Sequence, residues 1–177
     1  MIESGTLDED SGVELLEGWL VPTVPKNPAH TFVLWAVQGR FSELLRNGYY
    51  IRAQEPITLA DSEPEPDLVV ARGTGPDYET RHPGPADVGV VVEVSGATLD
   101  RDRGIKKRIY ARAGIAQYWL FDLSNRKLLV WTRPLPDAPQ PDYGTVEAYS
   151  DQQSVPVNIE GLASAEIPVA NLLPRVR

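Results

Sequence analysis

The chain of 177 residues contains no cysteine, which excludes a disulfide framework, a cysteine zinc site, thiolate catalysis and thiol redox sensing. Histidine is scarce as well, because only His30 and His82 are present, so a histidine-rich metal site is not expected. Oxygen ligands remain, and these favour Mg²⁺, Mn²⁺ or Ca²⁺ as the metal that the chain would bind.

Long apolar runs are also missing. None approaches the roughly 20 residues of a membrane-spanning helix, and the acidic N-terminus lacks the basic start of a signal peptide. We therefore expect a cytoplasmic protein with no membrane partner. A chain of this length can bury a core of its own, so residues 1–177 are expected to form a single domain.

Positive charge is limited, since the net charge is −8, and phosphate contacts depend on lysine and arginine. Residues 100–113 are the exception, with six basic side chains against two aspartates. Two interpretations of this segment stay open. It is either a surface that contacts nucleic acid or simply the solvated face of a helix.

Hydrophobic periodicity predicts a hairpin at 13–23, followed by a first helix with its stop at Asn47-Gly48. Residues 49–59 suit a strand, residues 68–71 a short strand, and residues 73–86 a mobile surface loop. The first helix is predicted from apolar residues near helical spacing, namely Phe32, Trp35, Val37, Phe41, Leu44 and Leu45.

The second half of the chain contains the most apolar segment, 88–94, whose valines predict a strand buried near the centre of a sheet. A second helix is predicted over 100–113, with Ile105, Ile109 and Ala113 as its apolar stripe and Gly114 as its end. Strands are expected at 117–123 and 127–132 and a loop at 134–141, while the last 35 or so residues carry weak strand signals and a Pro/Leu-rich tail that cannot be placed. The fold class is therefore α/β or α+β, a mixed sheet with helices.

Glu93 is the most informative single residue, because a carboxylate within an apolar strand is costly unless it is paired or binds a cation. A salt bridge to a nearby basic residue is as good an explanation as a metal. Alternation places Glu93 with Gly89 and Val91 on one face of the strand, and Val88 with Val90, Val92 and Val94 on the other.

Asp67 stands at the mouth of the strand 68–71, where a simple turn role is the plainer explanation for a Pro-Asp pair. If the two strands adjoin, Asp67 and Glu93 can reach one divalent ion that activates a water. Lys106 could then orient that water or stabilise developing negative charge. His30 is a candidate general base, although capping or packing is the better expectation, and packing is likewise favoured for Tyr110.

Four segments of the chain together resemble the Uma2 (DUF820) family of restriction-endonuclease-like proteins. These are VELLEG (13–18), PDLVV (66–70), VVVEVSG (90–96) and DRGIKKRIYARAGIAQYWLFD (102–122). The resemblance covers most of residues 13–123. It implies the PD-(D/E)XK nuclease fold, a mixed sheet flanked by helices, with Mg²⁺ held by two acids and hydrolysis assisted by a lysine.

The resemblance also implies roles for particular residues. Asp67 and Glu93 match the metal-binding acids, with the backbone carbonyl of Val94 as a further ligand and Glu14 as an additional metal-linked carboxylate. The lysine of the basic motif would fall at Ser95, but in this family it has moved to the following helix, where Lys106 matches it. Gln117 departs from the pattern, because relatives are expected to have glutamate there.

Two functional hypotheses follow. The first is a Mg²⁺- or Mn²⁺-dependent endonuclease that hydrolyses DNA, with RNA not excluded, by a metal-activated water. In it Asp67, Glu93 and Lys106 are the catalytic residues, and Arg101, Arg103 and Lys107 contact the nucleic-acid backbone. The second is a nuclease-like module that binds nucleic acid or protein without cutting, with a homodimer as a candidate assembly. Its support is the net charge and the displaced lysine.

Overall fold

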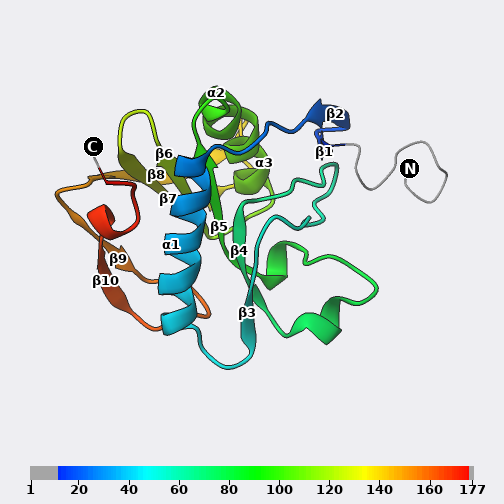
Figure 1. Ribbon diagram of the computed structural model, residues 1–177. Helices are drawn as coiled ribbons and strands as arrows, with labels where there is room; N and C mark the ends of the chain where they lie inside the picture. Colours follow the sequence, from blue (N-terminus) through cyan, green and yellow to red (C-terminus); the bar gives the residue numbers. More distant parts are fainter. Residues whose placement is uncertain (1–11, 176–177) are drawn as a thin grey trace.

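The computed structural model describes residues 12–175, and its framework is a six-stranded sheet (Figure 1). The acidic N-terminus, in which no signal peptide was expected, lies outside the described residues. The strands have the order β3-β4-β5-β6-β7-β8, and only β5 and β6 are parallel. The predicted mixed sheet is thus confirmed. Its strands are β3 (Tyr49–Arg52), β4 (Leu68–Arg72), β5 (Val88–Ser95), β6 (Gln117–Asp122), β7 (Lys127–Leu135) and β8 (Asp142–Ser150).

The predicted hairpin is present as β1 (Val13–Leu16) and β2 (Trp19–Pro22), which pair with each other outside the main sheet. Glu17 and Gly18 form its turn with φ values of 49° and 80°, the positive values that a two-residue type I′ turn requires. The turn is held against the rest of the chain, since the Gly18 N–H donates to the Asp61 carbonyl at 2.9 Å.

Helix α1 (Pro28–Leu44) crosses one face of the sheet (Figure 1). It begins where the Asn27 side chain accepts a hydrogen bond from the His30 N–H, with proline in the first turn. Val33, Ala36, Val37 and Phe41 are buried against the sheet, whereas Phe32 and Trp35 of the predicted apolar pattern point to solvent.

The second predicted helix is present but irregular. Segments α2 (Leu99–Arg101), η3 (Asp102–Lys106) and α3 (Lys107–Arg112) follow one another, and η3 is a π-helix in which the Lys107 N–H donates to the Asp102 carbonyl. This helix covers the opposite face of the sheet from α1 and connects β5 to the parallel strand β6. Gly114, with φ of 74°, follows its end as predicted.

The predicted strand over 49–59 is only partly correct, because regular pairing stops at Arg52. Gln54 adopts φ of 58°, and its N–H donates to the carbonyls of Pro66 and Asp67 rather than to a strand partner. The loop at 73–86 contains two short 3₁₀ turns, η1 (Gly75–Tyr78) and η2 (Pro85–Asp87).

The C-terminal region, which the sequence left unassigned, supplies β8 and a second hairpin on the α1 side of the sheet (Figure 1). Its apolar residues pack with α1 in one core cluster, so the region completes that core. The hairpin strands are β9 (Ser154–Val157) and β10 (Ala165–Pro168), followed by the 3₁₀ turn η4 (Val169–Asn171). No helix within residues 12–175 is long and apolar enough to span a membrane.

Every residue of β5 is buried, as predicted for a central strand. Val90, Val92 and Val94 face α1, and Val91 packs on the other side with Tyr110 of α3. The expectation that Val88 shares the face of Val90 is wrong. The register between β4 and β5 shifts after Val70, so Val88 joins the cluster on the α3 side.

Candidate active site

Asp67 lies directly before β4, beside the end of β5. The two strands are antiparallel neighbours in which Leu68 pairs with Val92, so the adjacency that the sequence argument required is present. Asp67 Oδ2 accepts a hydrogen bond from the Val94 backbone N–H at 2.8 Å and lies 3.0 Å from His30 Nε2. These contacts fix a nearly buried carboxylate at the C-terminal end of β5.

Glu93 meets a buried lysine from the helix that follows β5. Lys106 Nζ donates to Glu93 Oε1 at 2.9 Å, and the Tyr110 hydroxyl donates to the same oxygen at 2.8 Å. The ammonium also lies 2.8 Å from Glu14 Oε2 of the N-terminal hairpin. The predicted salt bridge of Glu93 is therefore present. Metal binding by Glu93 stays a prediction.

The π-helical segment explains how a lysine on a helix reaches this strand. Asp102, Lys106 and Tyr110 follow one another at intervals of four and are all buried. Ile105, which was expected on the apolar stripe, is only half buried. A π-helical turn widens the helix and shifts the angular position of the residues after it, a device that is frequent at functional sites.

Burial dominates the electrostatics of the site. It raises the pKa of Glu93 to about 8, opposed by the Lys106 ammonium and reinforced by the negative charges of Asp67, Asp102 and Glu14. For Lys106 burial acts to lower the pKa, but the carboxylates of Glu93 and Glu14 outweigh it, so the pKa is raised above its ordinary value. The lysine therefore stays charged, while burial favours the protonated form of Glu93.

We predict that the stability of the metal-free protein responds to pH through Glu93. Because its folded pKa is raised above the ordinary value of 4.5, its contribution is largest below pH 4.5 and is lost as pH rises through about 8. The free energy of unfolding, taken relative to Glu93→Gln, should fall by a few kcal/mol across this window. Urea titrations from pH 4 to 9 measure it, and a difference that stays flat would contradict the raised pKa.

A cavity of about 100 Å³ opens where the ends of α1, β5 and the second helix meet, and both acids border it. Glu14 and Lys106 are not among its lining residues, so they hold Glu93 from behind. The lining residues are Val24, Pro25, Lys26, Asn27, His30, Asp67, Glu93, Val94, Gly96, Ala97, Thr98, Arg101, Asp102 and Leu123.

The free oxygens at this cavity fit a divalent cation. Asp67 accepts its hydrogen bonds through Oδ2 and Glu93 through Oε1, so within residues 12–175 no hydrogen bond reaches Oδ1 or Oε2. Mg²⁺ needs only one or two carboxylates, because it keeps several waters and binds substrate phosphate oxygens. The described part of the chain contains no group of three or more acidic or histidine side chains spaced to hold a metal, so a two-acid site is what the residues offer.

Two residues at the cavity, Asp102 and Lys26, were not singled out from the sequence as binding groups. Asp102 is buried and accepts hydrogen bonds from the Ser95 and Thr98 hydroxyls, which ties the start of the second helix to the end of β5. The sequence contained a signal for Asp102, because a residue four positions before Lys106 lies on the same side of a helix. Lys26 gave no such signal, because only the fold brings the start of α1 to the cavity. His30, which was a candidate general base with capping or packing as the better expectation, places its Nε2 3.0 Å from Asp67 Oδ2.

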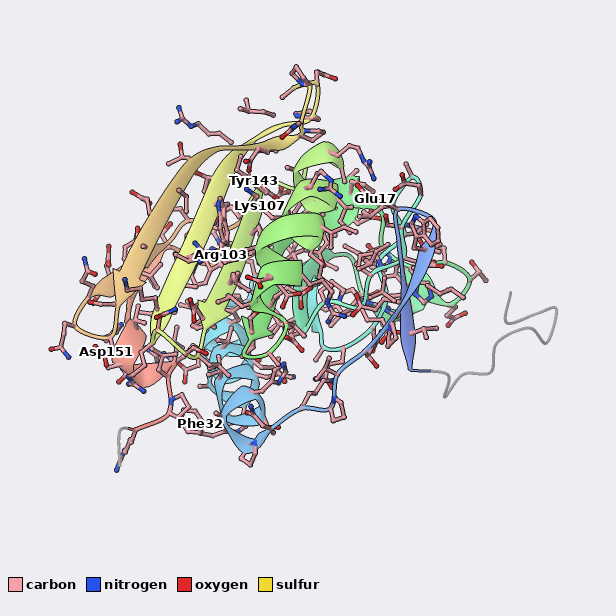
Figure 2. The ribbon with its side chains drawn as sticks, turned by 90° about the horizontal axis from the view of Figure 1, so that it is seen from above. Glu17, Phe32, Arg103, Lys107, Tyr143 and Asp151 are labelled. Atoms are coloured by element: carbon pink, nitrogen blue, oxygen red, sulfur yellow. The ribbon has the colours of Figure 1, made fainter. Side chains whose placement is uncertain are left out.

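The basic residues expected to contact nucleic acid are dispersed around the second helix. Arg101 borders the cavity and donates to the Pro22 carbonyl at 2.9 Å, while Arg103 is exposed. Lys107 pairs with Asp142 at 2.8 Å, and Figure 2 shows it beside Tyr143, across the helix from Glu17. Of the three, only Arg101 adjoins the acid pair.

Comparison with solved structures identifies the class of fold. A protein described as a putative nuclease belonging to DUF820, from Anabaena variabilis, superposes with a TM-score of 0.74 at 15% sequence identity. The match covers 96% of this chain and 94% of the other. A mixed sheet with flanking helices and an acid pair at adjoining strand ends therefore defines a nuclease-like α+β fold.

The family follows from the sequence itself. Residues 3–170 match the model of the Uma2 family, which is described as "Putative restriction endonuclease", and the chain belongs to this family. No curated protein matches the sequence significantly. The resemblance seen in the four sequence segments and the predicted fold class are both confirmed.

Proposed function

We propose that the protein is a Mg²⁺- or Mn²⁺-dependent endonuclease that hydrolyses phosphodiester bonds in DNA. The observation that carries this proposal is the pair of carboxylates, Asp67 and Glu93, that border one cavity with an oxygen of each free. The family description supports the same class of reaction.

In this proposal Asp67, Glu93 and the Val94 carbonyl hold the cation, which when bound polarises a phosphate oxygen and lowers the pKa of a water. Lys106 keeps Glu93 oriented and places a positive charge directly behind it. Its direct contact with the attacking water stays a prediction, as does a metal contact by Glu14, whose described partner is Lys106.

The substrate phosphate is placed by the cationic side of the cavity. Arg101 and Lys26 both border it, so each can bind a phosphate oxygen while the two acids bind the cation. Of these two residues, we assign the contact with the scissile phosphate to Arg101. Arg103 and Lys107 would then contact the backbone further from the scissile bond.

The proposal is tested by incubating supercoiled plasmid and linear oligonucleotides with the wild-type protein at low salt. We expect cleavage with Mg²⁺ or Mn²⁺, none in EDTA, and a rise in melting temperature when the metal is added, because a ligand that binds only the folded state stabilises it. Absence of metal-dependent cleavage on every DNA and RNA form would overturn the proposal.

A second candidate function is binding without cleavage, and the placement of Lys106 favours it. The lysine is 2% exposed, and its ammonium forms ion pairs with two buried carboxylates. These ion pairs compete with any contact between the ammonium and a substrate or water. Calorimetric titration with Mn²⁺ separates the two functions. A protein that only binds nucleic acid would show no metal binding that depends on Asp67 and Glu93.

A further inference from the structure

The solvent-facing side of α1 next to the cavity carries an aromatic pair. Trp35 is 70% exposed and Phe32 is 37% exposed, and their rings lie 5.8 Å apart. Figure 2 shows Phe32 near the N-terminal end of α1. Contiguous apolar side chains that are exposed to solvent mark an interaction site more often than single exposed apolar residues do.

This aromatic pair is continuous with the candidate active site. Lys26 borders the cavity of Asp67 and Glu93, and it also borders a shallow depression lined by Pro28, Thr31, Phe32 and Trp35. Phe32 and Trp35 follow His30, which contacts Asp67, by two and five residues along α1. A strand whose phosphate lies in the cavity can therefore extend over the rings.

The distribution of charge fits a polyanion at this place. The chain has 25 acidic residues, yet none occurs between Glu17 and Glu43 or between Asp102 and Asp122. These are the two longest acid-free stretches of the sequence. They contain Lys26 with α1 up to Ser42 on one side of the cavity and, after Asp102, the rest of η3 with α3 on the other. Within these two stretches the segments that flank the site therefore carry no carboxylate, while Asp102 at the start of η3 borders the cavity itself.

We propose that Phe32 and Trp35 form a stacking platform for an unpaired base of the substrate, so that the protein acts on single-stranded or locally opened DNA. Aromatic side chains bind any base through its face, and a base in an intact duplex presents no free face. Lys26 holds the phosphate between the platform and the cavity. The position of that phosphate rests on the proposed function, whereas the binding surface does not.

The chain offers a direct optical probe of this proposal. Of its four tryptophans, Trp119 and Trp131 are buried in the core and Trp19 lies on the distant hairpin, 76% exposed. In a Trp19→Phe background Trp35 is the only exposed tryptophan. Titration with oligothymidylate in EDTA should quench its fluorescence, while a duplex of the same length should quench it far less.

The matched variants are Trp35→Ala, Trp35→Phe and Trp19→Ala. We expect Trp35→Ala to weaken oligothymidylate binding about tenfold and leave duplex binding unchanged, Trp35→Phe to restore most of the affinity, and Trp19→Ala to have no effect. Because Trp35 is largely exposed, these variants should keep the wild-type melting temperature.

Equal loss of single-strand and duplex affinity, no loss at all, or no binding of oligothymidylate by the wild type would overturn the proposal. So would a change from dimer to monomer in Trp35→Ala by sedimentation, which would assign the aromatic pair to a second copy of the chain. Failure of the proposed function gives a different pattern, in which Trp35-dependent binding persists but no metal-dependent cleavage occurs.

Discussion

Asp67→Asn is expected to lower the rate of metal-dependent cleavage by about 10³-fold or more, because it removes one of the two charged ligands of the proposed metal site and with it several kcal/mol of transition-state stabilisation. The asparagine carbonyl can still accept the hydrogen bond that the Val94 N–H donates to Asp67 at 2.8 Å. The fold should therefore persist. Single-turnover cleavage over a series of Mn²⁺ concentrations measures the effect, and calorimetry should show that metal binding is weakened.

The control for Asp67→Asn is Asp137→Asn, which changes the net charge equally at an exposed position between β7 and β8. A general reduction in repulsion of DNA would raise binding in both variants, so only the difference between them reports on the site. If both variants cleave at the wild-type rate, Asp67 holds no catalytic metal and the two-acid site is wrong.

Lys106→Met is expected to destabilise the protein by about 3–5 kcal/mol at pH 8, because it leaves Glu14 and Glu93 buried without their shared cation. The loss should shrink as pH falls, since Glu93 then takes up a proton and its charge no longer needs a partner. Urea unfolding at a series of pH values measures both effects, and cleavage by the folded variant reports whether Glu93 still holds the metal.

Lys107→Met is the matched control for this experiment. It makes the same chemical change one residue along the helix, where the ammonium pairs at the surface with Asp142, whose side chain is 49% exposed. A surface pair contributes about 0–1 kcal/mol, so the two variants should differ by several kcal/mol. Equal effects would show that the buried ion pair contributes no more than a surface one.

The hairpin, both helices and the central strand could be predicted from the sequence because each depends on local spacing. The Glu17-Gly18 turn and the valines of β5 are signals that act within a few residues. The strand expected to reach residue 59 failed for a non-local reason. Gln54 donates its N–H to Pro66 and Asp67, residues that no local pattern brings near it.

The exposed aromatic pair shows the same limit at the level of side chains. Phe32 and Trp35 have the spacing of a buried stripe, but α1 turns Val33, Val37 and Phe41 to the sheet instead. Two faces of one helix can both carry apolar residues, and which one is buried depends on what the helix packs against. The same holds for Ile105, which the π-helical segment turns partly outward while Lys106 is buried.

The sequence by itself determined that a carboxylate stands in an apolar strand, that this carboxylate needs a partner, and that the chain resembles one family. Only the tertiary structure decided which partner it has. Lys106 Nζ reaches Glu93 and Glu14 together, and Asp67 meets the end of β5, because residues distant in sequence pack at one end of the sheet. Burial supplies the reason for both, since a charge removed from water must find its counter-charge within the fold.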